Sequence, residues 1–104
     1  MTRPANALRG ETELMVAGQR FLLRPSFENL IAAEAEVGSL FALVERASEG
    51  TITIAEITAL LWHCIDGNSR PDRDTVGNAV IEKGLVEATK PVRTILAQVL
   101  QGQS

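Results

Sequence analysis

The hydrophobic pattern is densest between Thr53 and Asp66, in the segment TIAEITALLWHCID. On a helix of about 3.6 residues per turn, its apolar side chains cover more than half of the circumference. In order around the helix they are Leu60, Cys64, Ile57, Leu61, Ile54, Ile65, Thr58, Trp62 and Ala55, and the polar wedge is Glu56, Ala59, His63 and Asp66. Thr53 and Glu56 have the spacing of a capping box, and Gly67 is placed to end the helix. The pattern predicts a central helix that other elements cover on several sides.

A period of two replaces the helical period between Gly10 and Arg24, which predicts a β-hairpin. A two-residue turn at Ala17 and Gly18 would form three pairs on one apolar side: Leu14 with Phe21, Val16 with Gln19, and Thr12 with Leu23. The other side would pair Glu11 with Arg24. Because alanine rarely adopts positive backbone angles, a bulged turn of three or four residues is an alternative. Two strands are marginal in water, so the hairpin must pack on helices, and its unpaired edges can accept a strand from another chain.

Four further helices are predicted over residues 26–37, 39–49, 73–83 and 89–101. Their starts are marked by capping side chains at Ser26, Ser39 and either Asp72 or Asp74, and their ends by Gly38, Gly50 and Gly84. The last helix should start close to Thr89, because Pro91 is tolerated only near a first turn.

The faces that these helices are expected to turn toward the core are mostly apolar. They comprise Phe27, Leu30, Ile31, Ala33 and Val37; Leu40, Phe41, Leu43, Val44 and Ala47; and Val76, Gly77, Val80 and Ile81. Glu34 falls within the first face and is expected to accept from the free amides at Ser39 and Leu40. Gly77 is expected to allow a close helix approach. The fold class that follows is α+β, mostly α: an N-terminal antiparallel β-hairpin packed on an array of about five short helices.

The composition, 104 residues with 45% hydrophobic and 22% charged, fits one domain. We expect a flexible N-terminus over residues 1–8, a single domain over 9–101 and frayed residues 102–104. No apolar run reaches the roughly 20 residues of a membrane span, and the first ten residues lack the apolar core of a signal peptide, so a cytoplasmic location is expected. The single cysteine, Cys64, lies on an apolar helical face and is expected to be a reduced core residue.

The net charge of −3 is unevenly distributed. Residues 26–66 hold seven acidic residues and one basic residue, Arg46. Neither end has the density of basic residues that a phosphate backbone requires, so nucleic acid is not an expected partner. The acidic middle is interpreted first as a solvated face and second as a surface that attracts a basic partner.

No catalytic set is found in the sequence. His63 is the only histidine, and it lacks an obvious catalytic partner. His63 and Cys64 are adjacent and therefore lie on different helix faces, which does not fit the spacing of zinc ligands. Phosphate-binding glycine loops are also missing, so we expect no enzyme activity, metal or cofactor. The segment TVGNAVIEKGLVE looks like the end of a winged-helix recognition helix, but helical period follows where a β wing would stand, and that helix has only Arg73 and Lys83 to meet phosphates.

The order of these features resembles a family of small proteins of gene transfer agents and tailed phages, classed as tail assembly chaperones and sometimes labelled tail tube proteins. The matching stretches are Arg9-Gly10-Glu11, the turn at Gly18, ENLIAAEAEVGSLFALVERASEG with Glu34, Gly38, Ser39, Leu40 and Gly50, then TIAEITALLWHCIDG and VGNAVIEKGL. The resemblance covers residues 9–101. It implies a cytoplasmic, non-enzymatic protein of a prophage or gene transfer agent that holds the long, apolar, helical tape measure protein soluble during virion morphogenesis. The alternatives are a structural tail tube component, which would require more β-sheet, and a winged-helix-like DNA-binding regulator.

The expected partners are the tape measure protein, other tail proteins and further copies of the chain, with no nucleic acid and no membrane. The candidate partner-binding stripe lies on the last helix: Val92, Ile95, Leu96, Val99 and Leu100. The hairpin edge is the other candidate. The sequence leaves open the alternative that the stripe completes the core. Structural roles are predicted for Glu34, Thr53, Glu56, Trp62, Gly38 and Gly84.

Overall fold

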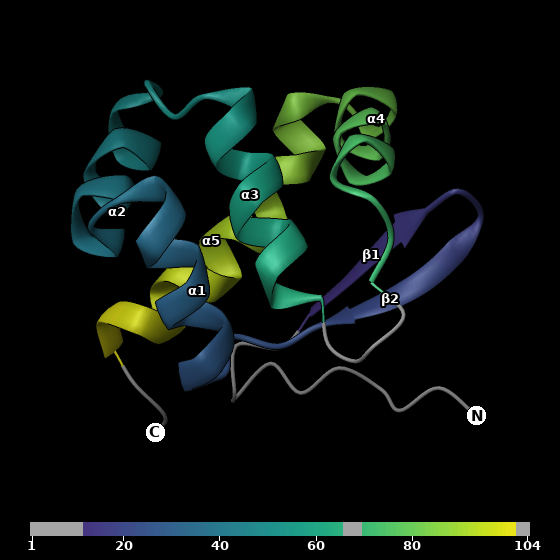
Figure 1. Cartoon of the computed structure of the whole chain (residues 1–104). Helices are drawn as coiled ribbons and strands as arrows, with labels where there is room; N and C mark the ends of the chain where they lie inside the picture. Colours follow the sequence, from purple (N-terminus) through teal and green to yellow (C-terminus); the bar gives the residue numbers. More distant parts are fainter. Residues whose placement is uncertain (1–11, 66–69, 102–104) are drawn as a thin grey trace.

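The computed structural model describes residues 12–65 and 70–101. Within them the chain forms β1 (Thr12–Val16), β2 (Gln19–Leu23), α1 (Phe27–Val37), α2 (Leu40–Glu49), α3 (Ile54–Cys64), α4 (Arg73–Lys83) and α5 (Leu85–Gln101). Figure 1 shows α3 at the centre, with α1 and α2 on one side and α4 and the hairpin on the other. The predicted fold class, α+β and mostly α, is confirmed.

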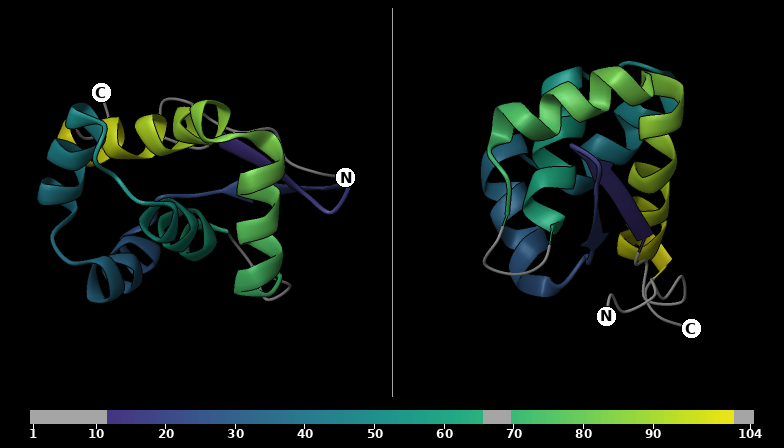
Figure 2. Two further views of the ribbon diagram at one scale, coloured as in Figure 1. Left: turned by 90° about the horizontal axis from the view of Figure 1, so that it is seen from above. Right: turned by 90° about the vertical axis from the view of Figure 1, so that its right-hand side faces the viewer.

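The helix α3 is covered on several sides, as its apolar pattern predicts. It contacts α1, α4 and α5, and the view from above in Figure 2 shows it enclosed between them. Its residues Ile57–Leu61 and Cys64 are all buried. Ala59, which the helical projection assigns to the polar wedge, is only 1% exposed, whereas Ile54 is 45% exposed. Both differences arise because the covering helices do not extend evenly around α3.

The hairpin has the predicted register. Thr12 pairs with Leu23, Leu14 with Phe21 and Val16 with Gln19. Ala17 and Gly18 have φ values of 52° and 78°, the positive pair that a type I′ turn requires. The bulged alternative is therefore wrong, and alanine occupies a left-handed position despite its steric cost. The predicted pair of Glu11 with Arg24 involves a residue outside the described part of the chain.

The end of α3 joins the hairpin. Helix α3 stops at Cys64, two positions before the predicted end, and Ile65 takes an extended conformation with ψ at 121°. Ile65 forms an antiparallel bridge with Leu23, and the Arg24 amide donates to the Cys64 carbonyl over 2.8 Å. Strand pairing therefore competes with the last helical turn. Part of the β2 edge is covered in this way, while the predicted stop at Gly67 and residue Asp66 lie outside the described residues.

The helix caps predicted at Ser26 and Ser39 form, whereas the one predicted at the start of α4 does not. Ser26 and Ser39 accept hydrogen bonds from the amides of Asn29 and Ala42, and Gly38, Gly50 and Gly84 follow the ends of α1, α2 and α4. The carboxylate of Glu34 accepts from the Leu40 amide at 3.1 Å, which confirms the expected link between α1 and α2. Asp72 stands at the N-cap of α4 but makes no capping side-chain hydrogen bond.

The capping box of α3 is complete. The Thr53 hydroxyl accepts from the Glu56 amide at 3.1 Å, and the Glu56 carboxylate accepts from the Thr53 amide at 2.9 Å. Arg46 of α2 donates to the second Glu56 oxygen. Burial raises the pKa of Glu56, but the hydrogen bonds from Arg46 and Thr53 outweigh it and lower the pKa overall. The box therefore also ties α2 to the start of α3.

Four residues that the periodicity assigns to the core are exposed. They are Phe27 (81%), Ile31 (50%), Phe41 (67%) and Ile81 (56%). Their helices lie at the periphery, so each helix is covered on one side only, and part of its apolar arc faces solvent. The neighbouring positions Ala33, Leu40, Leu43, Val76 and Val80 are buried as predicted.

Helix α5 begins earlier than predicted. It starts at Leu85 rather than close to Thr89, and Pro91 lies inside it. The Ala88 amide donates to the Gly84 carbonyl at 2.9 Å, which forms the first helical turn directly after α4. Pro91 cannot donate to the carbonyl four residues earlier, at a cost that burial of Ala88 and Pro91 offsets. Tertiary packing thus outweighs the local preference of proline.

Candidate partner-binding surfaces

A groove of about 390 Å³ lies between α2 and α5. Its lining is mostly apolar, from Val44, Ala47, Ser48, Arg93, Leu96, Ala97 and Leu100. Leu96 is 4% exposed, whereas Leu100 is 52% exposed. The guanidinium of Arg93 forms no ion pair within the part of the chain that the structure describes. This combination of apolar lining and one free positive charge suits an amphipathic segment with an acidic residue.

The groove divides the predicted partner-binding stripe. Val92, Ile95 and Leu96 are buried in the core, Val99 is half-buried against it, and Leu100 is exposed. The alternative that the stripe completes the core therefore holds for its first three residues. A binding role stays a prediction for the C-terminal part of the stripe, at Val99 and Leu100.

A charged cluster joins three helices beside α3. Glu36 of α1 accepts two hydrogen bonds from Arg73 of α4, at 2.6 and 2.9 Å, and its Oε1 lies 2.8 Å from Nε2 of His63 in α3. The hydrogen bonds from Arg73 and then His63 hold the pKa of Glu36 at about 2, below the 4.5 of a free glutamate. No partner for His63 was predicted from the sequence, because Glu36 is distant along the chain. No local signal indicates this cluster.

Trp62 anchors the segment that leads into α4. Its indole Nε1 donates to the Pro71 carbonyl at 2.7 Å. The guanidinium carbons of Arg70 and Arg73 lie 4.7 and 4.4 Å from the centre of a Trp62 ring, in cation–π contact. The structural role predicted for Trp62 has a physical basis in these contacts, which fix the position of α4 against α3.

Cys64, the residue that follows His63 on α3, is a buried free thiol. Burial raises the pKa of the Cys64 thiol to about 12, so the thiol stays protonated and unreactive at neutral pH. Across residues 12–65 and 70–101 there is no group of three or more His, Cys, Asp or Glu side chains placed to hold a metal ion.

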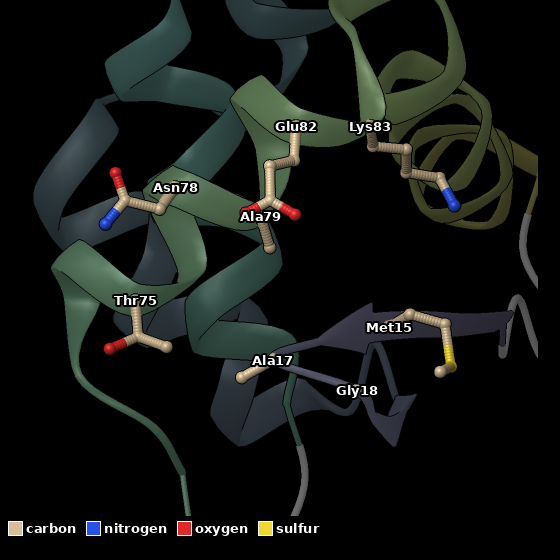
Figure 3. Close-up of a pocket in the computed structure, with 8 residues that line it drawn as sticks. All are labelled: Met15, Ala17, Gly18, Thr75, Asn78, Ala79, Glu82 and Lys83. Carbon is tan, nitrogen blue, oxygen red and sulfur yellow. The ribbon is translucent and has the colours of Figure 1, made fainter.

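A hollow of about 380 Å³ separates the hairpin from α4. Figure 3 shows Met15, Ala17 and Gly18 below it and Thr75, Asn78, Ala79, Glu82 and Lys83 above it. Its polar side chains extend from α4 along different directions in this view and do not converge on one point.

Comparison with known families gives a match over most of the chain. Residues 9–102 match a family model described as phage tail tube protein, GTA-gp10. The chain belongs to this family. No curated protein and no solved structure matches the chain. The resemblance to gene transfer agent and phage tail proteins is therefore confirmed, and the family gives the chain a tail-related role that involves other tail proteins.

The DNA-binding alternative lacks structural support. A winged helix would have a β wing after α4, but Leu85–Gln101 forms α5. Of the two basic residues of α4, Arg73 is already held by Glu36 and Trp62.

None of the helices in the described part of this tail-family protein is both long and apolar enough to span a bilayer.

Proposed function

We propose that this protein is a tail assembly chaperone that binds the tape measure protein during tail morphogenesis in the cytoplasm. It acts without catalysis or a cofactor, by covering apolar helical segments until the tail tube polymerises along them. Family membership supports the tail-related part of the proposal. The groove between α2 and α5 supports the binding mode, because it can take one face of an amphipathic helix.

The single observation that carries the proposal is the difference in exposure between Leu96 and Leu100, which both line the groove from α5. Leu96 is buried at the base of the groove, and Leu100 is exposed at its rim, one helical turn later. A docked apolar side chain would cover Leu100 and contact Val44 and Ala47 across the groove. Arg93 would then meet an acidic residue on the polar side of the docked helix.

The small size of the groove is consistent with weak, reversible binding. One groove of about 390 Å³ buries too little surface for tight binding by a single copy. Many copies along one tape measure protein would add their weak contacts through avidity, and growth of the tube could displace them one by one. Weak single-copy binding is therefore an expected property of this chaperone.

Co-expression with the tape measure protein tests the proposal. We expect the wild-type chain to keep the tape measure protein soluble and to co-purify with it, and Leu100→Asp to abolish both effects. Val86→Asp is the matched control, because Val86 lies on the same helix, is 79% exposed and is distant from the groove. Equal recovery of the tape measure protein with Leu100→Asp and with wild type would reject the groove as the site. An insoluble tape measure protein in the presence of wild type would reject the function.

A structural role in the tail tube is the second candidate, because the family description names a tail tube protein. Closing a tube wall generally relies on extensive β-sheet, and the described residues form one two-stranded sheet. Quantitative mass spectrometry of purified particles separates the two functions. A tube component would be present in many copies per particle, whereas a displaced chaperone would be absent.

A further inference from the structure

Helix α4 contributes little apolar surface to the core. Its buried side chains are Val76 and Val80, and Ala79 packs partly against the core. Among the described residues, each of the other helices and strands places at least one leucine in the core or against it, whereas α4 places none there. A valine gains less from burial than a leucine, because it has one CH₂ group fewer. Hydrophobic packing therefore holds α4, which lies at the outside of the molecule in Figure 2, less firmly than it holds α3 and α5.

The sequence of α4 is also a poor helix former. In RDTVGNAVIEK, most residues between the two ends have low helix propensity, and the interior Gly77 has the lowest of them. Asp72 stands at the N-cap without a capping side-chain hydrogen bond. An isolated helix of 11 residues is marginal in water even when it consists of good helix formers. If α4 leaves α3, it should therefore unfold as well.

The contact between α4 and α3 is incompletely packed. A groove of about 440 Å³ lies between the two helices, beside Gly77. Thr58 Oγ1 and Arg73 Nε are buried at this contact and have no hydrogen-bond partner among the described residues. Buried polar atoms without a partner destabilise the closed arrangement, and water can solvate them once it opens. This contact therefore favours closure of α4 only weakly.

Polar contacts at the start of α4 offset these weaknesses. Arg73 donates to both carboxylate oxygens of Glu36, at 2.6 and 2.9 Å, and one of these oxygens also lies 2.8 Å from Nε2 of His63. The guanidinium carbon of Arg73 lies 4.4 Å from the centre of a Trp62 ring, and the Trp62 indole donates to the Pro71 carbonyl. Paired, charge-assisted hydrogen bonds of this kind are among the stronger ones in proteins. We name the contacts of Arg73 with Glu36 and Trp62 the polar latch.

We propose that α4 detaches and unfolds as a unit while the rest of the fold stays closed, and that the polar latch sets how often this opening occurs. Opening breaks the latch and exposes Val76 and Val80, but it leaves the contacts of α3 with α1 and α5 in place. Local opening at a lower free energy than global unfolding is typical of elements with few buried apolar contacts. The unit ends at Gly84, the one residue between α4 and α5.

Opening of α4 uncovers one face of α3. Thr58 and Trp62 are four residues apart and lie on this face, where Thr58 is next to Gly77 and Trp62 contacts the start of α4. In the closed structure Thr58 is only 7% exposed. The polar latch therefore controls access to a part of the central helix that the closed chain keeps from solvent.

Native-state hydrogen exchange of the full chain, followed by NMR, tests the proposal. We expect the amides of residues 76–84 to exchange through an opening that leaves the amides of residues 58–64 in α3 protected. Glu36→Gln weakens the latch at nearly constant side-chain size and should speed exchange in α4 about fivefold or more. Gly77→Ala should slow it about fivefold, because alanine favours the helix and its Cβ would fit 3.7 Å from Thr58 Cγ2.

Glu56→Gln is the matched control. It makes the same substitution in a second glutamate–arginine pair, Glu56 with Arg46, which joins α2 to α3 and stays intact when α4 opens. Glu56→Gln should speed exchange in α3, which requires global unfolding, and leave exchange in α4 unchanged. The proposal is overturned if the α4 amides are as protected as those of α3, or if Glu56→Gln speeds exchange in α4 as much as Glu36→Gln does. These measurements involve no partner, so their outcome is independent of the proposed function.

Discussion

Helices α3 and α5 both carry long apolar stretches, but the fold uses them differently. In α3, every residue from Ile57 to Leu61 is buried, because α1, α4 and α5 cover it. In α5, burial extends from Ala88 to Leu96 and gives way to exposure at Leu100. The difference shows that apolar periodicity reports a side chain's suitability for burial, while the neighbouring elements determine whether it is buried.

Deletion of residues 89–104 should have the largest effect on this comparison. It removes Val92, Ile95 and Leu96, which complete the core around α3, so we expect loss of cooperative unfolding. Thermal melting followed by circular dichroism measures this. A truncated chain that still unfolds cooperatively would show that α3 forms its core without α5, and that the whole stripe is available for binding.

Two leucine substitutions, one in each helix, should have the second-largest effect. Leu61→Ala in α3 should lower the free energy of unfolding by about 2–5 kcal/mol, because Leu61 is fully buried and its loss leaves a cavity. Leu100→Ala in α5 should change it by no more than about 0.5 kcal/mol. Urea denaturation measures both values. Similar losses for the two variants would contradict the division between core and surface.

The smallest effect should be the pH dependence of the Glu36 cluster, which contacts α3 and not α5. Because the pKa of Glu36 is about 2 in the folded chain and near 4.5 when free, the cluster stabilises the fold above pH 4.5. This stabilisation is lost as the pH falls toward 2. Wild type should thus be more stable than Glu36→Gln at neutral pH, and the difference should shrink between pH 4.5 and 2. A difference that stays constant over this range would show that the charge of Glu36 is not involved.

The described part of the hairpin and the helix caps followed from the sequence. The pairing of Leu14 with Phe21 and the capping box of Thr53 with Glu56 both form as predicted. These features depend on residues a few positions apart, where chain connectivity keeps the partners close. The hydrogen bond from the Leu40 amide to Glu34 belongs to the same class, since it spans six positions.

The candidate sites followed from the sequence only in part. The apolar stripe on α5 was predicted. Its division into a buried part up to Leu96 and a more exposed part after it was not predicted, because this depends on where α2 ends beside α5. The groove between α3 and α4 that Thr58 and Gly77 line had one local signal, the glycine within an apolar helical face. Its other half, Thr58, comes from α3 and has no sequence signal that points to α4.

The sequence by itself determined which segments become helices, where most of them are capped and how the two strands pair. These are local properties, set by backbone preferences and by hydrogen bonds within a few residues. Only the tertiary structure decided that Phe27 and Phe41 face solvent, that α5 continues through Pro91, and that Glu36 meets His63 and Arg73. Each of these depends on which elements pack against one another. Hydrophobic attraction has no preferred direction, so the apolar pattern of one helix does not specify its neighbours.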